Sequence, residues 1–369
     1  MKKKIIISVL VIALCLTLFT ACYGDKDYLK DVENYGFWDN TAATSIAQPQ
    51  IGRMARDFLS SPSEDGKPRK VAFIGYDGCR ADALINVLKT SSSTASYYEA
   101  SPVSGLTELL GKEGAGIYLA YAGGEKGKDN EQATSTAPGW AALLSGQWGA
   151  VNGVTDNGMC KNIENKTFML EAAVGEYGEN YRTTFAASWG EHFTKTYLSE
   201  IEYLREKSDV EKKNITDGAN FDDITAYLDA ISESSSVDMD YKYVATDADL
   251  HEYLLSCVEE GGENERDVIF GIYEGTDHNG HDTGFGNDNY NYIKGFRDQD
   301  ARCYELLQAI YSRPSFENED WLIIITADHG GIQTWHGGQT LEERTTWIAC
   351  NKAIDSKYFS SGYDGYKAG

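Results

Sequence analysis

Four of the six histidines lie in two short glycine-rich segments, and each segment also carries an aspartate. The segments are EGTDHNGHDTG, at 274–284, and TADHGGIQTWHGG, at 326–338. Carboxylates gathered this closely repel one another, and a divalent cation relieves that repulsion. Mixed aspartate and histidine ligation suits zinc best, and manganese or iron next. The two segments therefore predict a site for divalent metal, with these candidate ligands: Asp277, His278, His281, Asp328, His329 and His336.

The elements that must position these residues are buried strands. Three apolar runs end in an acid: KVAFIGYDG contains Asp77, DVIFGIYEGTD ends in Asp277, and WLIIITADHG contains Asp328. In parallel α/β sheets, ligands sit beyond the carboxyl ends of the strands. A single aspartate after a strand is more commonly a helix cap or a turn residue. Three of them, two with histidines nearby, predict that the carboxylates converge in one crevice.

Further strands and helices alternate along the chain. Candidate strands cover 116–124, 181–190 and 345–350, and helical apolar spacing covers 249–260 and 300–313. This alternation predicts an α/β fold, with a doubly wound, mostly parallel central sheet and helices on both faces. We expect a tether and lead-in over residues 23–68 and one domain over 69–369. Residues 191–265 are rich in charge and serine, so we expect an insertion or cap there.

The first 22 residues have the features of a targeting segment. Three lysines precede an apolar run, Ile5 to Phe19, which is too short for a comfortable membrane span. The run ends in a small pair before Cys22, and the whole segment resembles a bacterial lipoprotein signal. Ordinary secretion with cleavage nearby is the alternative. We expect an extracytoplasmic protein, held at the membrane only through a lipid anchor on Cys22.

The composition narrows the range of partners. Removing residues 1–22 takes away three lysines and no acid, which changes the net charge from −24 to −27. Such a surface repels nucleic-acid backbones, so we expect no nucleic-acid polymer as a partner. The five cysteines beyond Cys22 are widely spaced, which excludes a disulfide scaffold or a cysteine zinc site. One or two disulfides remain open, and the sequence does not indicate an oligomeric state.

A candidate nucleophile lies in TSTAPGWAALLSG. Pro138 suits the first turn of a helix, which puts Thr136 at the helix N-terminus, where free N–H groups favour negative charge. A threonine hydroxyl is inert at neutral pH, but metal coordination stabilises its alkoxide. Taken alone, Thr136 reads as a helix cap. Thr134 and Ser135 are nearby alternatives.

These motifs together resemble a known enzyme superfamily. YEGTDHNGH resembles the metal segment of the alkaline-phosphatase-like superfamily, TADHGG its Asp-His-Gly segment, and FIGYDGCRAD its first metal aspartate. The motifs run from about 70 to 340 and are most similar to the nucleotide pyrophosphatase/phosphodiesterase branch. The resemblance implies an alkaline-phosphatase-like catalytic domain over 69–369.

The resemblance also implies two divalent ions, most naturally zinc. Its spacing, with Gly280, favours His281 over His278, and its Thr-x-Pro pattern selects Thr136. One ion would be held by Asp77, Asp328, His329 and the oxygen of Thr136. The other would be held by Asp277, His281 and His336. An asparagine at the position of Asn157 would donate to a non-bridging phosphate oxygen, although the alternative is a turn residue before Gly158.

The implied reaction is hydrolysis of a small phosphate ester through a phosphothreonine. SWGEHFTKTYLSE lacks the Lys-x-Arg pair that would bind the second charge of a monoester, although Lys195 is present. SWG resembles the W-P-G region of the diesterase branch. We therefore expect a phosphodiester or pyrophosphate substrate. The alternatives are a phosphomonoesterase, a phosphonate hydrolase, a phosphoethanolamine-type transferase and, more remotely, a non-enzymatic binding lipoprotein.

Overall fold

An eight-stranded sheet forms the centre of the molecule in the computed structural model, which describes residues 25–63, 65–88, 103–157, 163, 166–216 and 219–360. The strand order is β1-β3-β8-β7-β2-β6-β4-β5. The strands are β1 Ile46–Ala47, β2 Arg69–Tyr76, β3 Gly116–Tyr121, β4 Thr183–Ala187, β5 Met239–Tyr243, β6 Val268–Tyr273, β7 Asp320–Thr326 and β8 Thr345–Cys350.

Most neighbouring strands run in the same direction. The run β7-β2-β6-β4-β5 is parallel throughout, and β8 is antiparallel to both of its neighbours, β3 and β7. This sheet confirms the predicted α/β class with a mostly parallel centre. It also brings the carboxyl ends of β7, β2, β6 and β4 side by side along one edge.

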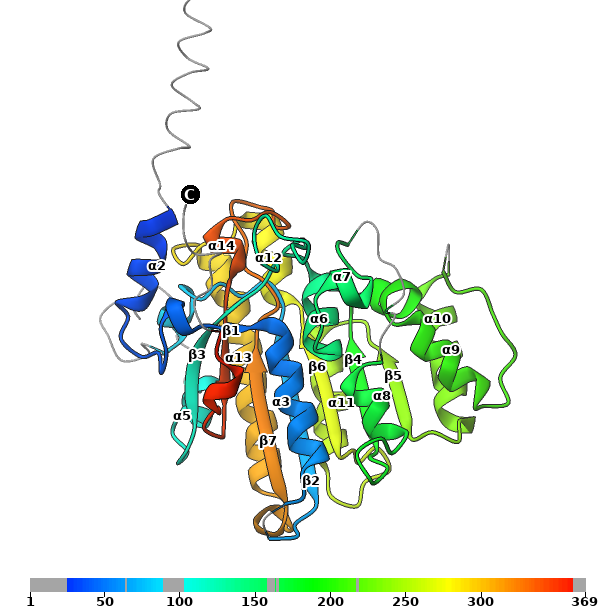
Figure 1. Ribbon diagram of the computed structural model, residues 1–369. Coiled ribbons are helices and arrows are strands. Elements are labelled where there is room, and N and C mark those ends of the chain that lie inside the picture. Colours follow the sequence, from blue (N-terminus) through cyan, green and yellow to red (C-terminus); the bar gives the residue numbers. More distant parts are fainter. Residues whose placement is uncertain are drawn as a thin grey trace, which may run out of the picture.

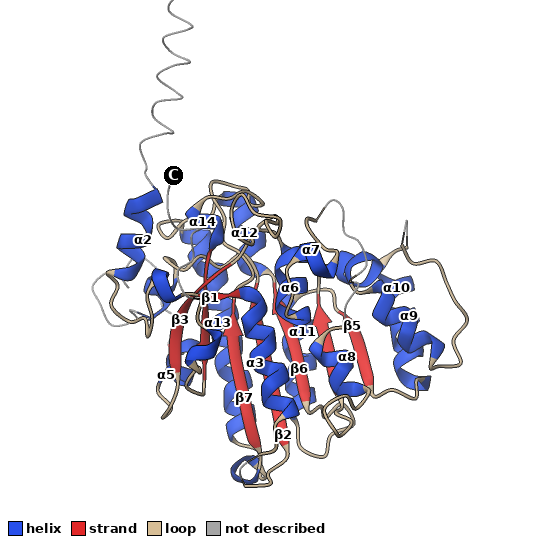
Figure 2. Cartoon of the chain, in the orientation of Figure 1, coloured by secondary structure: helices blue, strands red, loops and turns tan. Residues whose placement is uncertain are grey.

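Helices cover both faces of the sheet (Figure 1, Figure 2). One face carries α3 Gln48–Ser60, α6 Thr136–Ser145 and α8 Phe168–Ala173, and the other carries α5 Gly105–Leu110, α11 Asp247–Val258 and α13 Tyr290–Tyr311. Alternate side chains of β2 enter the two cores: Val71 and Phe73 pack on the first face, and Ala72 and Ile74 pack on the second. A strand buried on both faces needs a near-continuous apolar sequence, which β2 and β7 have.

Further helices and single turns complete the domain. The other α-helices are α2 Asp25–Glu33, α4 Leu84–Leu88, α7 Gly149–Asn152, α9 Leu198–Glu206, α10 Phe221–Ser234, α12 Gly275–Thr283 and α14 Leu341–Arg344. Single turns of 3₁₀-helix cover Ala42–Thr44, Phe316–Asn318 and Ser356–Tyr358, and a π-helical turn covers His192–Thr196.

The predicted tether over 23–68 is wrong for most of its length. The helix α3 packs its apolar face into the core through Ile51, Met54, Ala55 and Leu59. These residues follow the spacing of an amphipathic helix, so the pattern was present in the sequence. The short strand β1 also joins the sheet beside β3.

The segment 191–265 also differs from the expected cap. Its residues Met239–Tyr243 form β5, which pairs with β4 as the edge strand of the central sheet. Its last helix, α11, packs against β6 and β4. This part of the segment therefore belongs to the layered domain. The remaining domain boundaries stay a prediction.

Two predictions lie partly or wholly outside the described residues. Residues 1–22, including the lipid-anchor candidate Cys22, are not among them. Within the described part of the chain, no helix combines the length and the apolar character needed to cross a membrane. Cys79, Cys257, Cys303 and Cys350 are free thiols, and Cys160 lies outside the described residues.

Candidate active site

Two aspartates stand at the carboxyl ends of the neighbouring strands β2 and β7. Asp77 follows β2 directly, and its Oδ2 accepts a hydrogen bond from the Trp140 indole Nε1 at 2.8 Å. Asp328 lies two residues after β7, and its Oδ1 accepts a hydrogen bond from the Gly78 backbone N–H at 3.1 Å. Gly78 has a φ of 65°, and a Cβ there would lie 2.6 Å from Asp277 Oδ1. Only glycine suits that position, both for its conformation and for its space.

His329 completes this buried cluster. Its Nε2 lies 3.4 Å from Asp77 Oδ1 and 3.4 Å from Asp328 Oδ2. Its Nδ1 lies 2.7 Å from the carbonyl oxygen of Gly330, so Nδ1–H donates there and the Nε2 lone pair faces the carboxylates. Asp328 Oδ2 is buried and has no hydrogen-bond partner among the described residues. Three groups that all present lone pairs to one point fit a cation.

The pKa shifts in this cluster also favour a bound cation. Burial, and then the charge of Asp277, raise the pKa of Asp77 well above its usual value. Burial, and then the charge of Asp77, raise the pKa of Asp328 in the same way. Burial lowers the pKa of His329 to about 3, so the imidazole is neutral at physiological pH. A divalent ion would stabilise the two carboxylates in their charged forms.

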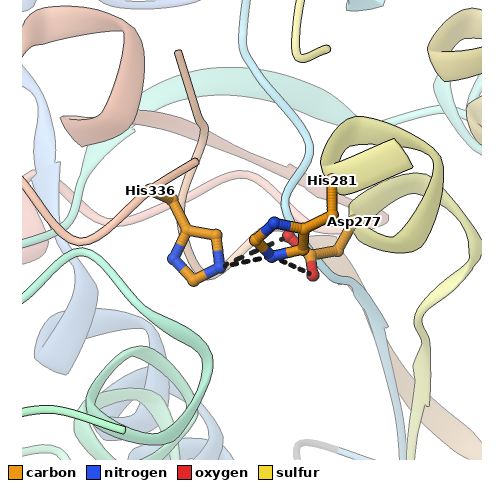
Figure 3. Close-up of side chains that lie close together, drawn as sticks. All are labelled: Asp277, His281 and His336. Carbon is orange, nitrogen blue, oxygen red and sulfur yellow. Dashed lines mark hydrogen bonds and ion pairs between the residues drawn. The ribbon is translucent and has the colours of Figure 1, made fainter. Parts of the chain in front are cut away.

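A second cluster lies beside the first, built from Asp277, His281 and His336 (Figure 3). Asp277 and His281 are one turn apart on α12, and His281 Nε2 lies 3.3 Å from Asp277 Oδ2. His336 Nε2 lies 3.7 Å from Asp277 Oδ1 and 3.0 Å from His281 Nε2. The rings of His329 and His336 stack with centroids 4.0 Å apart, so the two clusters are in contact.

Backbone carbonyls orient both imidazoles of the second cluster. His281 Nδ1 lies 3.0 Å from the Thr334 carbonyl oxygen, and His336 Nδ1 lies 3.2 Å from the Thr134 carbonyl oxygen. With Nδ1–H donating in each case, both Nε2 atoms face the carboxylate, and a bound metal ion would take the place of the proton on His281 Nε2. The hydrogen bond with Asp277 raises the pKa of His281 to about 9. Burial alone would raise the pKa of Asp277, but the hydrogen bond from His281 and the nearby histidines lower it.

Both clusters fit a divalent metal ion by the chemistry of their donors. In each one, three potential ligand atoms lie within 4.8 Å of one another. Asp277 Oδ1, like Asp328 Oδ2, is buried without a hydrogen-bond partner among the described residues. The first set offers two carboxylates and one imidazole, and the second offers one carboxylate and two imidazoles. The predicted ligands are thus brought together as the two predicted sets.

Thr136 lies at the first helical position of α6, beside the buried cluster. Its Oγ1 is 3.5 Å from Asp77 Oδ1 and 3.5 Å from His329 Nε2. Thr134, an alternative nucleophile, donates its hydroxyl to the Gly338 carbonyl oxygen at 2.8 Å. The Thr134 hydroxyl is therefore engaged in a hydrogen bond to the loop that carries His336. The geometry therefore favours Thr136 over Thr134 as the candidate nucleophile.

Asn157 is one of nine residues that line a cavity at the two clusters. Asn157 Oδ1 accepts a hydrogen bond from the Ala137 backbone N–H at 2.9 Å, which ties it to the start of α6. The cavity has a volume of about 180 Å³. Its lining consists of Asp77, Thr136, Asn157, Trp189, Glu274, Asp277, His278, His281 and His336.

Several features of the site differ from the sequence-based expectation. Asp277 does not end a strand, because β6 ends at Tyr273 and Asp277 is the third residue of α12. The acid that follows β6 directly is Glu274. The side chain of His278 is 67% exposed and lies 3.6 Å from a Glu274 carboxylate oxygen, outside the ligand set. Trp140, the hydrogen-bond donor to Asp77, was not anticipated, because an interaction across 63 residues leaves no local pattern.

Comparison with known proteins gives one family match. The family described as type I phosphodiesterase / nucleotide pyrophosphatase matches residues 129–349. A search of curated proteins finds no match. Similar solved structures include an alkaline phosphatase from the Antarctic bacterium TAB5, with 14% identity and a TM-score of 0.44 over 77% of this chain and 91% of that one. Murine ectonucleotide pyrophosphatase / phosphodiesterase 5 is 17% identical, with a TM-score of 0.39 over 72% of this chain and 58% of that one.

Proposed function

Because the chain belongs to the type I phosphodiesterase / nucleotide pyrophosphatase family, and is therefore a phosphoester hydrolase, we propose that it cleaves phosphodiesters or pyrophosphates with Thr136 as nucleophile. One observation carries the proposal. The Thr136 hydroxyl stands at a helix N-terminus, 3.5 Å from both Asp77 and His329, in a cluster whose donors fit a divalent ion. We assign two divalent ions to the two clusters, zinc first and manganese or iron next.

The reaction has two displacements at phosphorus. Bound divalent ions would supply charge neutralisation and lower the pKa of the attacking hydroxyl groups. Thr136 Oγ1 first forms a bond to phosphorus, while the bond from phosphorus to the leaving oxygen breaks. The leaving alcohol or nucleotide takes up the proton that Thr136 gives up. Water then attacks the phosphothreonine, the bond to Oγ1 breaks, and the threonine hydroxyl regains a proton.

The surroundings of Thr136 stabilise the negative charge on the transferred group. The N-terminal turn of α6 presents backbone N–H groups and the positive end of the helix dipole. Since Asn157 Oδ1 accepts from Ala137, we assign its Nδ2 as donor to a non-bridging phosphate oxygen. Loss of one such donor typically lowers kcat by about 10²- to 10³-fold.

The charge of the cavity supports a diester rather than a monoester. Its lining, as far as the structure describes it, contains no lysine or arginine. Lys195 lies 3.9 Å from Glu191 and is not part of the lining. A monoester carries a second negative charge, which would face Asp77, Glu274 and Asp277 without a matching cationic side chain.

The test compares two aryl esters on the zinc-loaded protein. We expect kcat/KM for bis-p-nitrophenyl phosphate to exceed that for p-nitrophenyl phosphate by at least about tenfold, because the described lining has no lysine or arginine to match the second charge of the monoester. A preference for the monoester would contradict the diesterase assignment. Turnover of neither ester, with both ions bound, would contradict hydrolysis of such bonds altogether.

We also propose that the protein works outside the cytoplasm as a lipid-anchored protein. The support is the sequence of residues 1–22, with its lysines, its apolar run and Cys22. Replacing Cys22 by alanine should move the protein from the membrane fraction to the soluble fraction. An unchanged membrane fraction would argue against the anchor.

A further inference from the structure

One buried carboxylate in the cavity wall belongs to neither metal cluster. Glu274 follows β6, is 3% exposed, and lines the same cavity as Thr136. The backbone N–H groups of Glu274 and Gly275 donate to the Asp247 carboxylate at 3.0 and 2.9 Å, which fixes this turn. Glu274 Oε1 has no hydrogen-bond partner among the described residues. A buried carboxylate oxygen without a donor is costly unless a ligand satisfies it.

An aromatic side chain follows the neighbouring strand. Trp189 follows the carboxyl end of β4, which pairs with β6, and it lines the same cavity as Glu274. The Trp189 ring packs at 89° against His192, with centroids 4.9 Å apart, so its plane is held in place. Tryptophan is the side chain whose ring face attracts cations most strongly. A carboxylate and a tryptophan that line one cavity together suit a positively charged group.

A charge balance leads to the same conclusion. The three carboxylates of the clusters, together with one phosphodiester anion, match the charge of two divalent ions. The negative charge of Glu274 is then left over, since the described lining has no lysine or arginine. The basic side chain near it in the lining is His278, whose Nε2 lies 3.6 Å from Oε2 and whose side chain is 67% exposed. Burial, and then the charges of Asp77 and Asp247, raise the pKa of Glu274 well above its usual value. Positive charge brought by a substrate would therefore be stabilised at this wall.

We propose that Glu274 and Trp189 form a subsite for an alkylammonium group carried by the part of the phosphodiester that remains on Thr136. The inference rests on the proposed function. Thr136 Oγ1 bonds to phosphorus as the other ester oxygen leaves, and water then releases an ammonium-bearing alkyl phosphate and restores the threonine. The ammonium group itself is not changed by the reaction. It selects the substrate through its charge.

The test uses two esters that differ by one charge. p-Nitrophenyl phosphorylcholine and p-nitrophenyl 3,3-dimethylbutyl phosphate have the same leaving group and nearly the same shape. The metal-loaded wild-type protein should cleave the choline ester with a kcat/KM about tenfold higher or more, as expected for a cation that contacts an aromatic face and a carboxylate. Equal values of kcat/KM would overturn the proposal.

Two variants test whether Glu274 and Trp189 cause the preference for the choline ester. In Glu274→Gln, kcat/KM for the choline ester should fall about tenfold more than that for the neutral ester, since the variant keeps the shape and removes the charge. Trp189→Leu should reduce the preference as well. The matched control is Glu191→Gln, which removes a carboxylate with a 40% exposed side chain outside the lining and should leave the preference intact. An equal loss for both esters in Glu274→Gln would overturn the proposal.

A binding measurement separates the subsite from catalysis. Phosphorylcholine should bind the wild-type protein more tightly than 3,3-dimethylbutyl phosphate in calorimetry, and Glu274→Gln should remove the difference. If Glu274→Gln instead loses an equivalent of bound metal, Glu274 is a metal ligand and the proposal is overturned. Hydrolysis of glycerophosphocholine would support a water-soluble substrate, and hydrolysis of phosphatidylcholine vesicles would support a lipid headgroup.

The same experiment distinguishes this inference from the proposed function. Turnover of bis-p-nitrophenyl phosphate and of the neutral ester, with no preference for choline, overturns the alkylammonium subsite and leaves the diesterase intact. Turnover of none of these esters by the protein with both ions bound overturns the diesterase and the subsite together.

Discussion

The two metal-binding clusters use the same residue types but are mounted differently. Asp77, Asp328 and His329 follow the buried strands β2 and β7, and each is at most 1% exposed. Asp277 and His281 lie on α12, and His336 follows a loop; the side chain of His281 is 32% exposed. The inner cluster is thus held by the sheet, whereas the outer cluster is held by a helix and a loop near solvent.

The inner and outer clusters also differ in the charge of their ligands. The inner cluster has two carboxylates for one imidazole, so without metal its main cost is repulsion between buried acids. The outer cluster has two imidazoles for one carboxylate, and without metal the raised pKa of His281 lets a proton take the place of the ion. We therefore expect the inner ion to bind more tightly and the outer ion to exchange more readily.

The largest effect is expected from breaking the inner cluster. Asp328→Asn should lower kcat/KM for bis-p-nitrophenyl phosphate by at least about 10³-fold. Loss of a residue that only hydrogen-bonds to a metal ligand costs about 10- to 100-fold, and loss of the ligand itself should cost more. The metal-free variant should melt at a higher temperature than the metal-free wild type, since the repulsion between Asp77 and Asp328 is relieved. Steady-state kinetics and thermal melting measure the two effects.

An exposed acid provides the control for this change. Asp298, whose side chain is 50% exposed and pairs with Lys294, lies on the surface of α13. Asp298→Asn should leave both activity and melting temperature nearly unchanged, because exposed ion pairs contribute about 0–1 kcal/mol. Retention of more than a tenth of the activity in Asp328→Asn would argue against a metal at the inner cluster.

A smaller and partly reversible effect is expected from the outer cluster. His281→Ala should lower kcat/KM by about 10²-fold, and raising the zinc concentration should restore part of the activity, because solvent reaches this cluster and can complete the coordination. His329→Ala should not recover in the same titration. Activity measured against free zinc concentration separates the two variants. Equal recovery would remove the distinction between inner and outer clusters.

Trp140 is not itself a metal ligand, but it hydrogen-bonds to one and therefore tests how the inner cluster is supported. Trp140→Phe removes the indole N–H that donates to Asp77 Oδ2 at 2.8 Å and keeps an aromatic ring in the core. Zinc affinity or kcat/KM should fall by about 10- to 100-fold. Zinc competition with a chelator measures the affinity. Unchanged affinity and activity would show that Asp77 does not depend on this bond.

The smallest effect is a difference in pH dependence. The folded pKa of His281, about 9, lies above its unfolded value of 6.5. In the metal-free protein, the ion pair with Asp277 therefore stabilises the fold fully below pH 6.5, and this contribution disappears as the pH rises through about 9. Zinc must displace that proton, so affinity at the outer cluster should rise by up to about tenfold per pH unit between 7 and 9.

Zinc titrations at pH 6.5, 7.5 and 8.5 measure this dependence. His329 adds nothing to it, because burial lowers its pKa to about 3 and no proton has to leave above neutral pH. His281→Ala should abolish the slope at the outer cluster. A wild-type affinity that does not change with pH would contradict the pairing of His281 with Asp277.

The sequence predicts the inner cluster better than its surroundings. Asp77 and Asp328 follow long apolar runs, and the position of a buried parallel strand fixes where the next residues go. The direction of β8 was not predictable, because six buried residues, TTWIAC, fit a parallel or an antiparallel neighbour equally well. The edge strand β5 was missed for a related reason, since MDYKY is short and only partly apolar.

The cavity wall shows a different limit. Glu274 and Trp189 come together because β4 and β6 are neighbours in the sheet, and their order along the chain does not reveal this pairing. The turn at Glu274 also depends on Asp247, 27 residues away in the sequence. In contrast, the spacing of Ile51, Met54 and Leu59 is that of an amphipathic helix, so the sequence did contain the information for α3, although a tether was predicted there. Functional residues that lie in one short segment can be recognised from the sequence, whereas residues that the sheet brings together from distant segments cannot.

The most direct test of the central claim is the activity and metal content of Thr136→Ala, measured together with bis-p-nitrophenyl phosphate as substrate. The account predicts that kcat/KM falls by at least about 10³-fold, while two equivalents of divalent metal remain bound, because the nucleophile is lost and the six aspartate and histidine ligands are kept. Activity above a tenth of the wild-type value, with both ions bound, would contradict Thr136 as the nucleophile.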